Sequence, residues 1–228
     1  MEYLKSSLIR QIDATAVQEL GISSLLLMEN AARGACEVLQ SQKPSGRILL
    51  ACGPGNNGGD GLAMARLLAA EGIESEVHLI RPGKPLTEDA ASNLGFLNRC
   101  GISVAESDAI SLQGAVSQLT PEDWLIDALL GTGIRGTLRS PYFEIVEAVN
   151  KSTAHVLSID VPSGLDSDTG EPCGVAVRAD VTVTFVASKA GFRFEHAIPY
   201  LGRVVVRHIG VPQRWLKTWI ALKGEIYT

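Results

Sequence analysis

The stretch Arg47-Ile-Leu-Leu-Ala-Cys-Gly-Pro-Gly-Asn-Asn-Gly-Gly-Asp-Gly61 decides the fold class of this chain. Residues 47–52 form a short and almost wholly apolar run, which is typical of a strand covered on both faces of a sheet. A glycine-rich turn follows, and residues 58–71 then have the apolar spacing of a helix. A buried strand that passes through glycines into a helix indicates a unit of a parallel sheet.

The same alternation of short apolar runs and helical patterns continues along the chain. Further strands are predicted at 74–80, 102–105, 124–129, 155–160, 180–186 and 203–208, and further helices at 87–100, 110–118 and 141–151. Because crossovers between parallel strands are right-handed, the helices should cover both faces. The pattern therefore predicts an α/β fold with a mostly parallel sheet.

The two ends of the chain read as helices outside this alternation. Helices are predicted at 8–20, ended by Gly21, and at 23–40, capped by Ser23. The stretch 210–228 predicts a C-terminal helix or tail with Trp215 and Trp219 on one face. Because no linker or repeat divides the sequence, we expect one domain, 1–228, with N-terminal helices in 1–40, a sheet core in 46–208 and the helix or tail in 210–228.

Composition narrows the class of protein. The chain has 228 residues, 46% of them hydrophobic, and a net charge of −5, with a sequence pI near 5.4. An acidic chain lacks the basic face that nucleic acid requires, so we expect no nucleic-acid partner. No segment approaches the ~20 apolar residues of a membrane span, and the N-terminus has no apolar leader. The four cysteines form no CxxC pair. We therefore expect a protein of the reducing cytoplasm with no membrane partner.

The first informative loop is the glycine-rich turn itself. Gly53, Gly55 and Gly58 match GxGxxG, but the next predicted strand ends at Arg81 rather than at the acid that would hold a ribose. A turn needs one or two glycines, whereas five of the nine positions from 53 to 61 are glycine. This density favours close approach to a ligand.

A second loop, Asp127-Ala-Leu-Leu-Gly-Thr-Gly-Ile-Arg-Gly-Thr137, follows another predicted strand. Asp127 lies inside an apolar run, where a charge is costly unless it is paired or bound to a cation. Arg135 has two readings, a phosphate ligand or a solvated loop charge. A second glycine-rich loop after a second strand favours a shared ligand cleft.

The third loop is Ser158-Ile-Asp-Val-Pro-Ser-Gly-Leu-Asp166. Asp160 ends a predicted strand, where α/β enzymes place an acid or base, and Ser163 follows in the turn. In an open α/β sheet, ligands bind outside the carboxyl ends of the strands. We therefore expect Asn57, Asp127, Asp160 and Ser163 to surround one pocket.

The residue types in these loops restrict the chemistry. No GxSxG motif or ordered histidine accompanies Ser163, which disfavours a serine hydrolase. The four histidines lack ligand spacing, which disfavours a transition-metal site. The Asn57 amide, the Asp127 carboxylate and the Ser163 hydroxyl are oxygen donors, which suit a hard cation. With one carboxylate among them, a monovalent ion such as potassium fits best.

Three motifs in order, GPGNNGGDG, DALLGTGIRG and SIDVPSGLDSDTG, closely resemble the NAD(P)H-hydrate epimerase family. The segments LMENAARG and TVTFVASKAGF are similar too, so the resemblance covers nearly the whole chain. It implies a Rossmann-like three-layer αβα sandwich that forms a homodimer. It also implies an isomerase that interconverts the R and S forms of hydrated NADH or NADPH. A separate ADP- or ATP-dependent dehydratase then completes this metabolite repair.

The resemblance also implies roles for individual residues. Asp160 is implied in substrate contact and catalysis, and Asn57, Asp127 and Ser163 in binding one potassium ion per subunit. Lys189 is either near the site or a surface lysine at a strand end. The other implied substrate contacts are Asn56, Asn57, Gly58, Gly59, Asp60, Gly131, Thr132, Gly133, Ile134, Arg135, Gly136 and Thr137.

Two other functions stay open from the sequence. One is a non-catalytic nucleotide-binding or scaffold module of the same fold, although loss of catalysis should have erased Asn57, Asp127 or Asp160. The other is a nicotinamide-dependent dehydrogenase, which the GxGxxG matches favour and the missing ribose acid disfavours.

Overall fold

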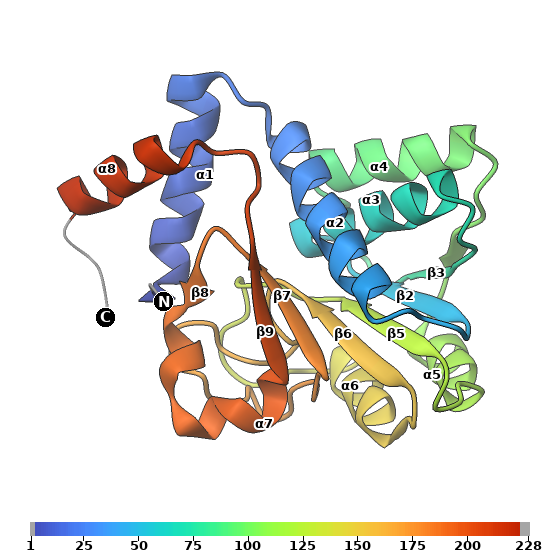
Figure 1. The fold of residues 1–228 in the computed structure, drawn as a ribbon. Coiled ribbons are helices and arrows are strands. Elements are labelled where there is room, and N and C mark those ends of the chain that lie inside the picture. The colour runs from blue at the N-terminus through green and yellow to red at the C-terminus, as the bar shows by residue number, and fades with distance from the viewer. Residues whose placement is uncertain (1–2, 224–228) are drawn as a thin grey trace.

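The central sheet orders the whole chain, as the computed structural model of residues 3–223 shows (Figure 1). Within these residues seven parallel strands have the order β4-β3-β2-β5-β6-β7-β9. The strands are β2 (Ile48–Cys52), β3 (Glu76–Leu79), β4 (Ala105–Glu106), β5 (Trp124–Ala128), β6 (His155–Ile159), β7 (Val181–Phe185) and β9 (Arg203–Arg207). The strand order reverses between β2 and β5, which is where such sheets open a ligand crevice.

Helices cover both faces of this sheet, so the three-layer αβα prediction is confirmed. Leu50 of β2 packs into a core with α2 (Ser24–Ser41), α3 (Asn56–Ala70) and α4 (Glu88–Arg99). Its neighbours Leu49 and Ala51 pack on the other face, against α5 (Ala109–Ser117) and α6 (Tyr142–Lys151). Over residues 3–223, no helix combines the length and apolar character that a membrane crossing requires.

The N-terminal segment is tied to the edge of the molecule by a small second sheet. Strand β1 (Tyr3–Leu4) pairs in parallel with β8 (Ser188–Lys189), and Leu4 lies opposite Lys189. Helix α1 (Ser6–Leu20) follows and ends at Gly21, whose φ of 67° is the left-handed conformation expected of a C-cap. Ser23 caps α2 by accepting a hydrogen bond from the Leu26 N–H, as the sequence predicts.

The C-terminal helix α8 (Gln213–Lys223) packs Leu216, Trp219 and Ile220 into the core cluster that also contains the buried apolar residues of α1. The rings of Trp215 and Trp219 stack with their centroids 6.1 Å apart, so the two share a face as predicted. Residues 224–228 of the predicted tail, and residues 1–2, lie outside the described residues.

The sequence analysis predicts no helix or strand between β7 and β9, but the structure has several short elements there. This segment contains β8, two short 3-10 helices, η1 (Ala190–Arg193) and η2 (Glu195–Ala197), and α7 (Ile198–Leu201). These elements are too short to show periodicity. Phe192, Ala197 and Leu201 instead form a small core with Val161 and Leu165, so long-range packing determines their structure.

Candidate functional site

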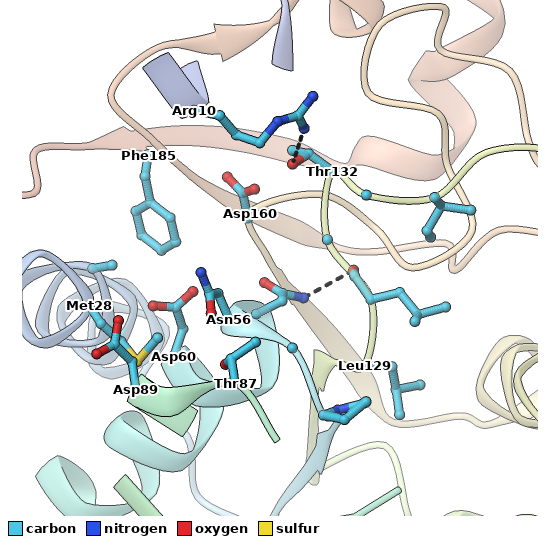
Figure 2. Close-up of a pocket in the computed structure, with 18 of the residues that line it drawn as sticks. Arg10, Met28, Asn56, Asp60, Thr87, Asp89, Leu129, Thr132, Asp160 and Phe185 are labelled. Carbon is cyan, nitrogen blue, oxygen red and sulfur yellow. Dashed lines mark hydrogen bonds between the residues drawn. The ribbon is translucent and has the colours of Figure 1, made fainter. Parts of the chain in front are cut away.

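A cavity of about 1120 Å³ opens at the carboxyl edge of the sheet (Figure 2). Its wall contains residues that follow β2, β3, β5, β6, β7 and β9, together with one face of α1. Because the strands are parallel, their carboxyl ends meet at one edge, and this volume has room for a nucleotide-sized ligand. The expected meeting of the three loops is confirmed for Asn57 and Asp160, which both line the cavity.

Asp160 has a strained backbone and a buried cationic partner. It follows β6 with a φ of 64°, a left-handed conformation that non-glycine residues adopt at a cost of roughly 1–2 kcal/mol. The Asp160 N–H donates a hydrogen bond to the Val183 carbonyl at 2.7 Å, which holds this turn in place. The Lys189 Nζ lies 2.6 Å from the Asp160 Oδ1, and the Lys189 side chain is 0% exposed. Lys189 therefore belongs to the site, and its reading as a surface lysine is wrong.

Further carboxyl groups line the cavity near Asp160. Asp60 and Asp89 lie together on one side, and Asp13 enters the wall from α1 (Figure 2 shows Asp60, Asp89 and Asp160). Burial raises the pKa of Asp60 well above its ordinary value, and the like charges of Asp160 and Asp13 raise it further. This end of the cavity is therefore acidic in composition, and Asp60 there holds its proton to a higher pH than a free carboxyl group does.

Asp13 is a site residue that the sequence analysis missed. Its Oδ1 is buried without a hydrogen-bond partner. Burial raises the pKa of Asp13 from 3.8 to about 6, with Lys189 opposing this shift and Asp160 adding to it. The sequence did contain a signal for Asp13. This acidic residue lies between Ile12 and Ala16, two residues of the apolar face of the helix that the structure buries. A carboxyl group beside such a face needs an explanation.

The raised pKa of Asp13 predicts a pH-dependent stability difference. In the folded state Asp13 holds its proton up to about pH 6, and in the unfolded state up to about 3.8. Wild-type stability should therefore fall as pH rises through this window. We expect Asp13→Asn to match the wild type below pH 4 and to be more stable by about 1–3 kcal/mol above pH 6. Urea unfolding across this pH range measures the difference, and a variant less stable at pH 7 contradicts it.

Basic side chains lie at the exposed part of the cavity wall: Arg10, Lys84, Arg135 and Arg139. Arg10 donates a hydrogen bond to the Thr132 Oγ1 at 3.4 Å, which links α1 to the loop after β5 (Figure 2). Arg135 lies 3.1 Å from Asp168 and 3.6 Å from Asp166, so it is an ion-paired residue of the cavity wall rather than a merely solvated charge. The cavity thus has an acidic end and a basic mouth.

The glycines of the first loop serve packing more than ligand approach. A Cβ on Gly53 would lie 1.8 Å from the Leu129 carbonyl oxygen, and one on Gly58 would lie 1.8 Å from the Gly53 oxygen. Gly59 and Gly61 are similarly crowded, by Met28 and by Ala128 with Cys52. Gly55 has open space around it and lines the cavity. Tight packing therefore accounts for four of these five glycines without a ligand, and ligand contact at these four positions stays a prediction.

Most of the predicted substrate contacts line the cavity, but three of them do not. Gly58 and Gly59 are buried outside the cavity wall, and Gly136 is exposed outside it. The predicted residues that do line the cavity are Asn56, Asn57, Asp60, Gly131, Thr132, Gly133, Ile134, Arg135, Thr137 and Asp160. The helix α3 begins at Asn56, two residues earlier than predicted, so its first turn forms part of the wall.

The predicted cation ligands come together just beneath the cavity. The Ser163 Oγ donates to the Asp127 Oδ1 at 2.5 Å and accepts from the Leu130 N–H at 2.9 Å. The Asn57 Nδ2 donates to the Leu130 carbonyl at 3.0 Å, while the Asn57 Oδ1 is buried with no hydrogen-bond partner. Asp127 and Ser163 are both 0% exposed and lie outside the cavity wall. The expectation that all four residues face one pocket is therefore wrong for these two.

Asp127 is held by a dense set of donors. Its carboxylate accepts hydrogen bonds from the Ser158 hydroxyl at 2.8 Å and from the Ser163 N–H at 2.8 Å. Burial raises the pKa of Asp127, and the bonds from Ser163 and Ser158 oppose that shift. This network joins β5, β6 and the loop after β6, so it fixes the floor beneath Asn57 and Asp160.

The sequence of this chain is similar to that of a known protein family and of named relatives. The family described as YjeF-related protein N-terminus matches residues 24–191. A Rhodopirellula baltica protein named NAD(P)H-hydrate epimerase is 39% identical over 209 residues, which cover 92% of this chain and 84% of that protein. A Pirellula staleyi protein of the same name is 38% identical, with 91% of this chain and 92% of that protein covered.

Longer relatives and a solved structure agree with this placement. The bifunctional NAD(P)H-hydrate repair enzyme Nnr of Methanothermobacter thermautotrophicus is 42% identical over 200 residues, which cover 85% of this chain and 37% of that protein. The crystal structure of yeast ynu0 matches with a TM-score of 0.72 and 26% identity, covering 84% of this chain and 83% of that one. The chain belongs to the NAD(P)H-hydrate epimerase family, whose domain is the YjeF-related protein N-terminus.

Proposed function

We propose that this chain is an NAD(P)H-hydrate epimerase, an isomerase that interconverts the R and S forms of hydrated NADH or NADPH at the nicotinamide C6 hydroxyl. The observation that carries the proposal is the Asp160–Lys189 pair, 2.6 Å apart, inside a nucleotide-sized cavity with an acidic end. The names of relatives that are 38–39% identical along most of the chain support the same activity.

The substrate chemistry explains why such a cavity is needed. The C6 hydroxyl lies next to the ring nitrogen, whose lone pair can expel it once the oxygen receives a proton. The product is water and an iminium-like ring, to which water returns on the other face. Asp160 can donate the proton and, as a carboxylate, face the cationic ring. The loops that contain Asn56 and Gly131–Thr137, with the basic mouth, supply donors for the diphosphate.

The donor set beneath the cavity fits one potassium ion per subunit. Asn57 Oδ1 is a buried oxygen without a partner. The Asn57 Nδ2 and the Ser163 hydroxyl both donate to the Leu130 carbonyl, which keeps the side chains of Asn57 and Ser163 in one neighbourhood. Oxygen donors beside one carboxylate, Asp127, suit a monovalent ion. Such an ion would supply positive charge that offsets the carboxylates and would fix the loops that contain Asn57 and Ser163.

Potassium should therefore stabilise the protein through Asn57. We expect the melting temperature to be higher in potassium chloride than in choline chloride of equal ionic strength, because an ion that binds only the folded state stabilises it. Asn57→Ala removes the unpartnered oxygen and should abolish this difference. Asn98→Ala, an exposed position on α4, should retain it. Equal melting temperatures of the wild type in both salts contradict the ion site.

We extend the proposal to the setting of the reaction. The chain functions as a cytoplasmic homodimer together with an ADP- or ATP-dependent NAD(P)H-hydrate dehydratase that consumes one epimer. The bifunctional repair enzymes among its relatives, which are longer than this chain, support such a partnership. Size-exclusion chromatography with light scattering tests the dimer.

A coupled assay tests the activity. A mixture of both hydrate epimers is supplied with a stereospecific dehydratase, and regeneration of NADH or NADPH is followed at its absorbance band. Without this chain the reaction should stop when the dehydratase's epimer is exhausted, and with it the reaction should run to completion. A reaction that stops at the same extent in both cases rejects the proposed activity.

A further inference from the structure

Helix α1 adds a carboxyl group to the cavity from outside the motifs that carry the family resemblance. The cavity wall includes Ile9, Arg10, Asp13, Ala14 and Val17, which recur at the helical spacing of one face. Asp13 is the acidic residue of this set. The strand ends and the loops that follow them provide another part of the wall, which includes Asp160 directly after β6.

Three contacts fix α1 against the rest of the site. Leu4 pairs with Lys189 between β1 and β8, so the segment before the helix is bound to the strand that supplies the Asp160 partner. The N–H and the hydroxyl of Ser6, at the start of α1, donate to the Asp168 carboxylate at 2.7 and 2.9 Å. One turn further on, Arg10 bonds to Thr132. The position of Asp13 is therefore set by the same loops that form the site.

The surroundings of the Asp13 carboxyl group are those of a group that can transfer protons rather than those of a carboxylate that stabilises the fold through hydrogen bonds. Its Oδ1 is buried and unpartnered, although a structural carboxylate such as Asp127 accepts several hydrogen bonds. The charged groups that face it are Lys189 and Asp160 from the strand side and Asp60 from α3. Because burial raises its pKa to about 6, Asp13 can hold or release a proton near neutral pH.

We propose that Asp13 is a second catalytic carboxyl group, which serves the face of the nicotinamide ring opposite to the face served by Asp160. This inference rests on the proposed epimerase function. Epimerisation needs proton transfer on both faces, because the hydroxyl leaves from one and water enters on the other. Two carboxyl groups that enter the cavity from different elements, α1 and the turn after β6, would meet this requirement, and the ring would not have to turn within the cavity.

The proton and electron balance is complete with these two groups. The carboxylic acid on the first face gives its proton to the C6 oxygen, and the C6–O bond breaks with its electron pair on the departing water. The nitrogen lone pair forms the N1=C6 bond. Water then attacks C6 from the second face, the N1=C6 pair returns to nitrogen, and the carboxylate there takes the proton. The two carboxyl groups have exchanged protonation states, and exchange with solvent resets them.

Labelling with oxygen-18 water separates this role from a structural one. Each purified epimer of NADH hydrate is incubated with the enzyme in labelled water, and both epimers are analysed by mass spectrometry. The wild type should label and interconvert both. Asp13→Asn and Asp160→Asn should each lower interconversion by about 10²–10⁴-fold. Each should still exchange label, without inversion, into the one epimer whose hydroxyl faces the remaining carboxyl group, and the two variants should label opposite epimers.

The controls make the outcome decisive. Glu19→Gln makes the same chemical change at an exposed position of α1 outside the cavity wall and should behave as the wild type. The inference is overturned if Asp13→Asn interconverts the epimers at the wild-type rate, or if the two variants label the same epimer, both epimers or neither. An inactive wild type in the coupled assay rejects the proposed function itself, so the two failures are distinguishable.

Discussion

Asp160→Asn is expected to lower the rate of epimer interconversion by about 10²–10⁴-fold, the usual contribution of a general acid–base group. The amide keeps the size of the side chain and tolerates the left-handed backbone at this position, where φ is 64°. It cannot exchange a proton with the C6 oxygen. The coupled assay with a stereospecific dehydratase measures the loss, and a variant that exchanges epimers at the wild-type rate removes Asp160 from the mechanism.

The same substitution leaves Lys189 buried without its carboxylate, 2.6 Å away in the wild type. Breaking one side of a buried ion pair destabilises by about 3–5 kcal/mol, so activity could be lost through unfolding. The double variant Asp160→Asn/Lys189→Met removes the unpaired charge as well. We expect it to recover much of the thermal stability of the single variant while staying inactive. Recovery of activity together with stability would assign Asp160 a structural role only.

Gly58→Ala is expected to destabilise the fold by about 3 kcal/mol, the upper end of the usual cost of overpacking, because the atoms in the way are rigid. The new Cβ would lie 1.8 Å from the Gly53 carbonyl oxygen and 2.6 Å from the Gly53 carbonyl carbon. Both are backbone atoms of the turn that links β2 to α3, so no side chain can move aside to relieve the contact. Urea unfolding followed by circular dichroism measures the loss, and stability equal to that of the wild type would contradict the packing argument.

Gly114→Ala is the matched control for this substitution. Gly114 lies exposed within α5, and its new Cβ would meet nothing within 4 Å. Because glycine is a poor helix former, alanine here should stabilise the protein by roughly 0.5–1 kcal/mol. The same chemical change is thus expected to have opposite signs at two helical positions, and only the three-dimensional surroundings distinguish them.

Residues that depend on long-range contacts could not be assigned from the sequence. Lys189 is 0% exposed because β8 pairs with β1 across the molecule, and a two-residue strand leaves no periodic signal in the sequence. Asp13 reads as one polar residue of an amphipathic helix until α1 is placed over the strand ends. The glycine-rich turn shows the same limit from the other side, because the sequence does not reveal that Gly53 and Gly58 are required by close packing against nearby backbone.

The sequence alone determined the layers of the fold and the edge at which its ligand site lies. Strands such as β2 and β5 are buried on both faces and so appear as continuous apolar runs, and their parallel order forces the loops after them to one edge. The tertiary structure alone decided which charges share the cavity. Contacts between segments far apart in the chain pair Lys189 with Asp160, bury the Asp13 carboxyl group and seal Asp127 with Ser163 beneath the floor. Desolvation by such contacts raises the pKa of Asp13 and of Asp127.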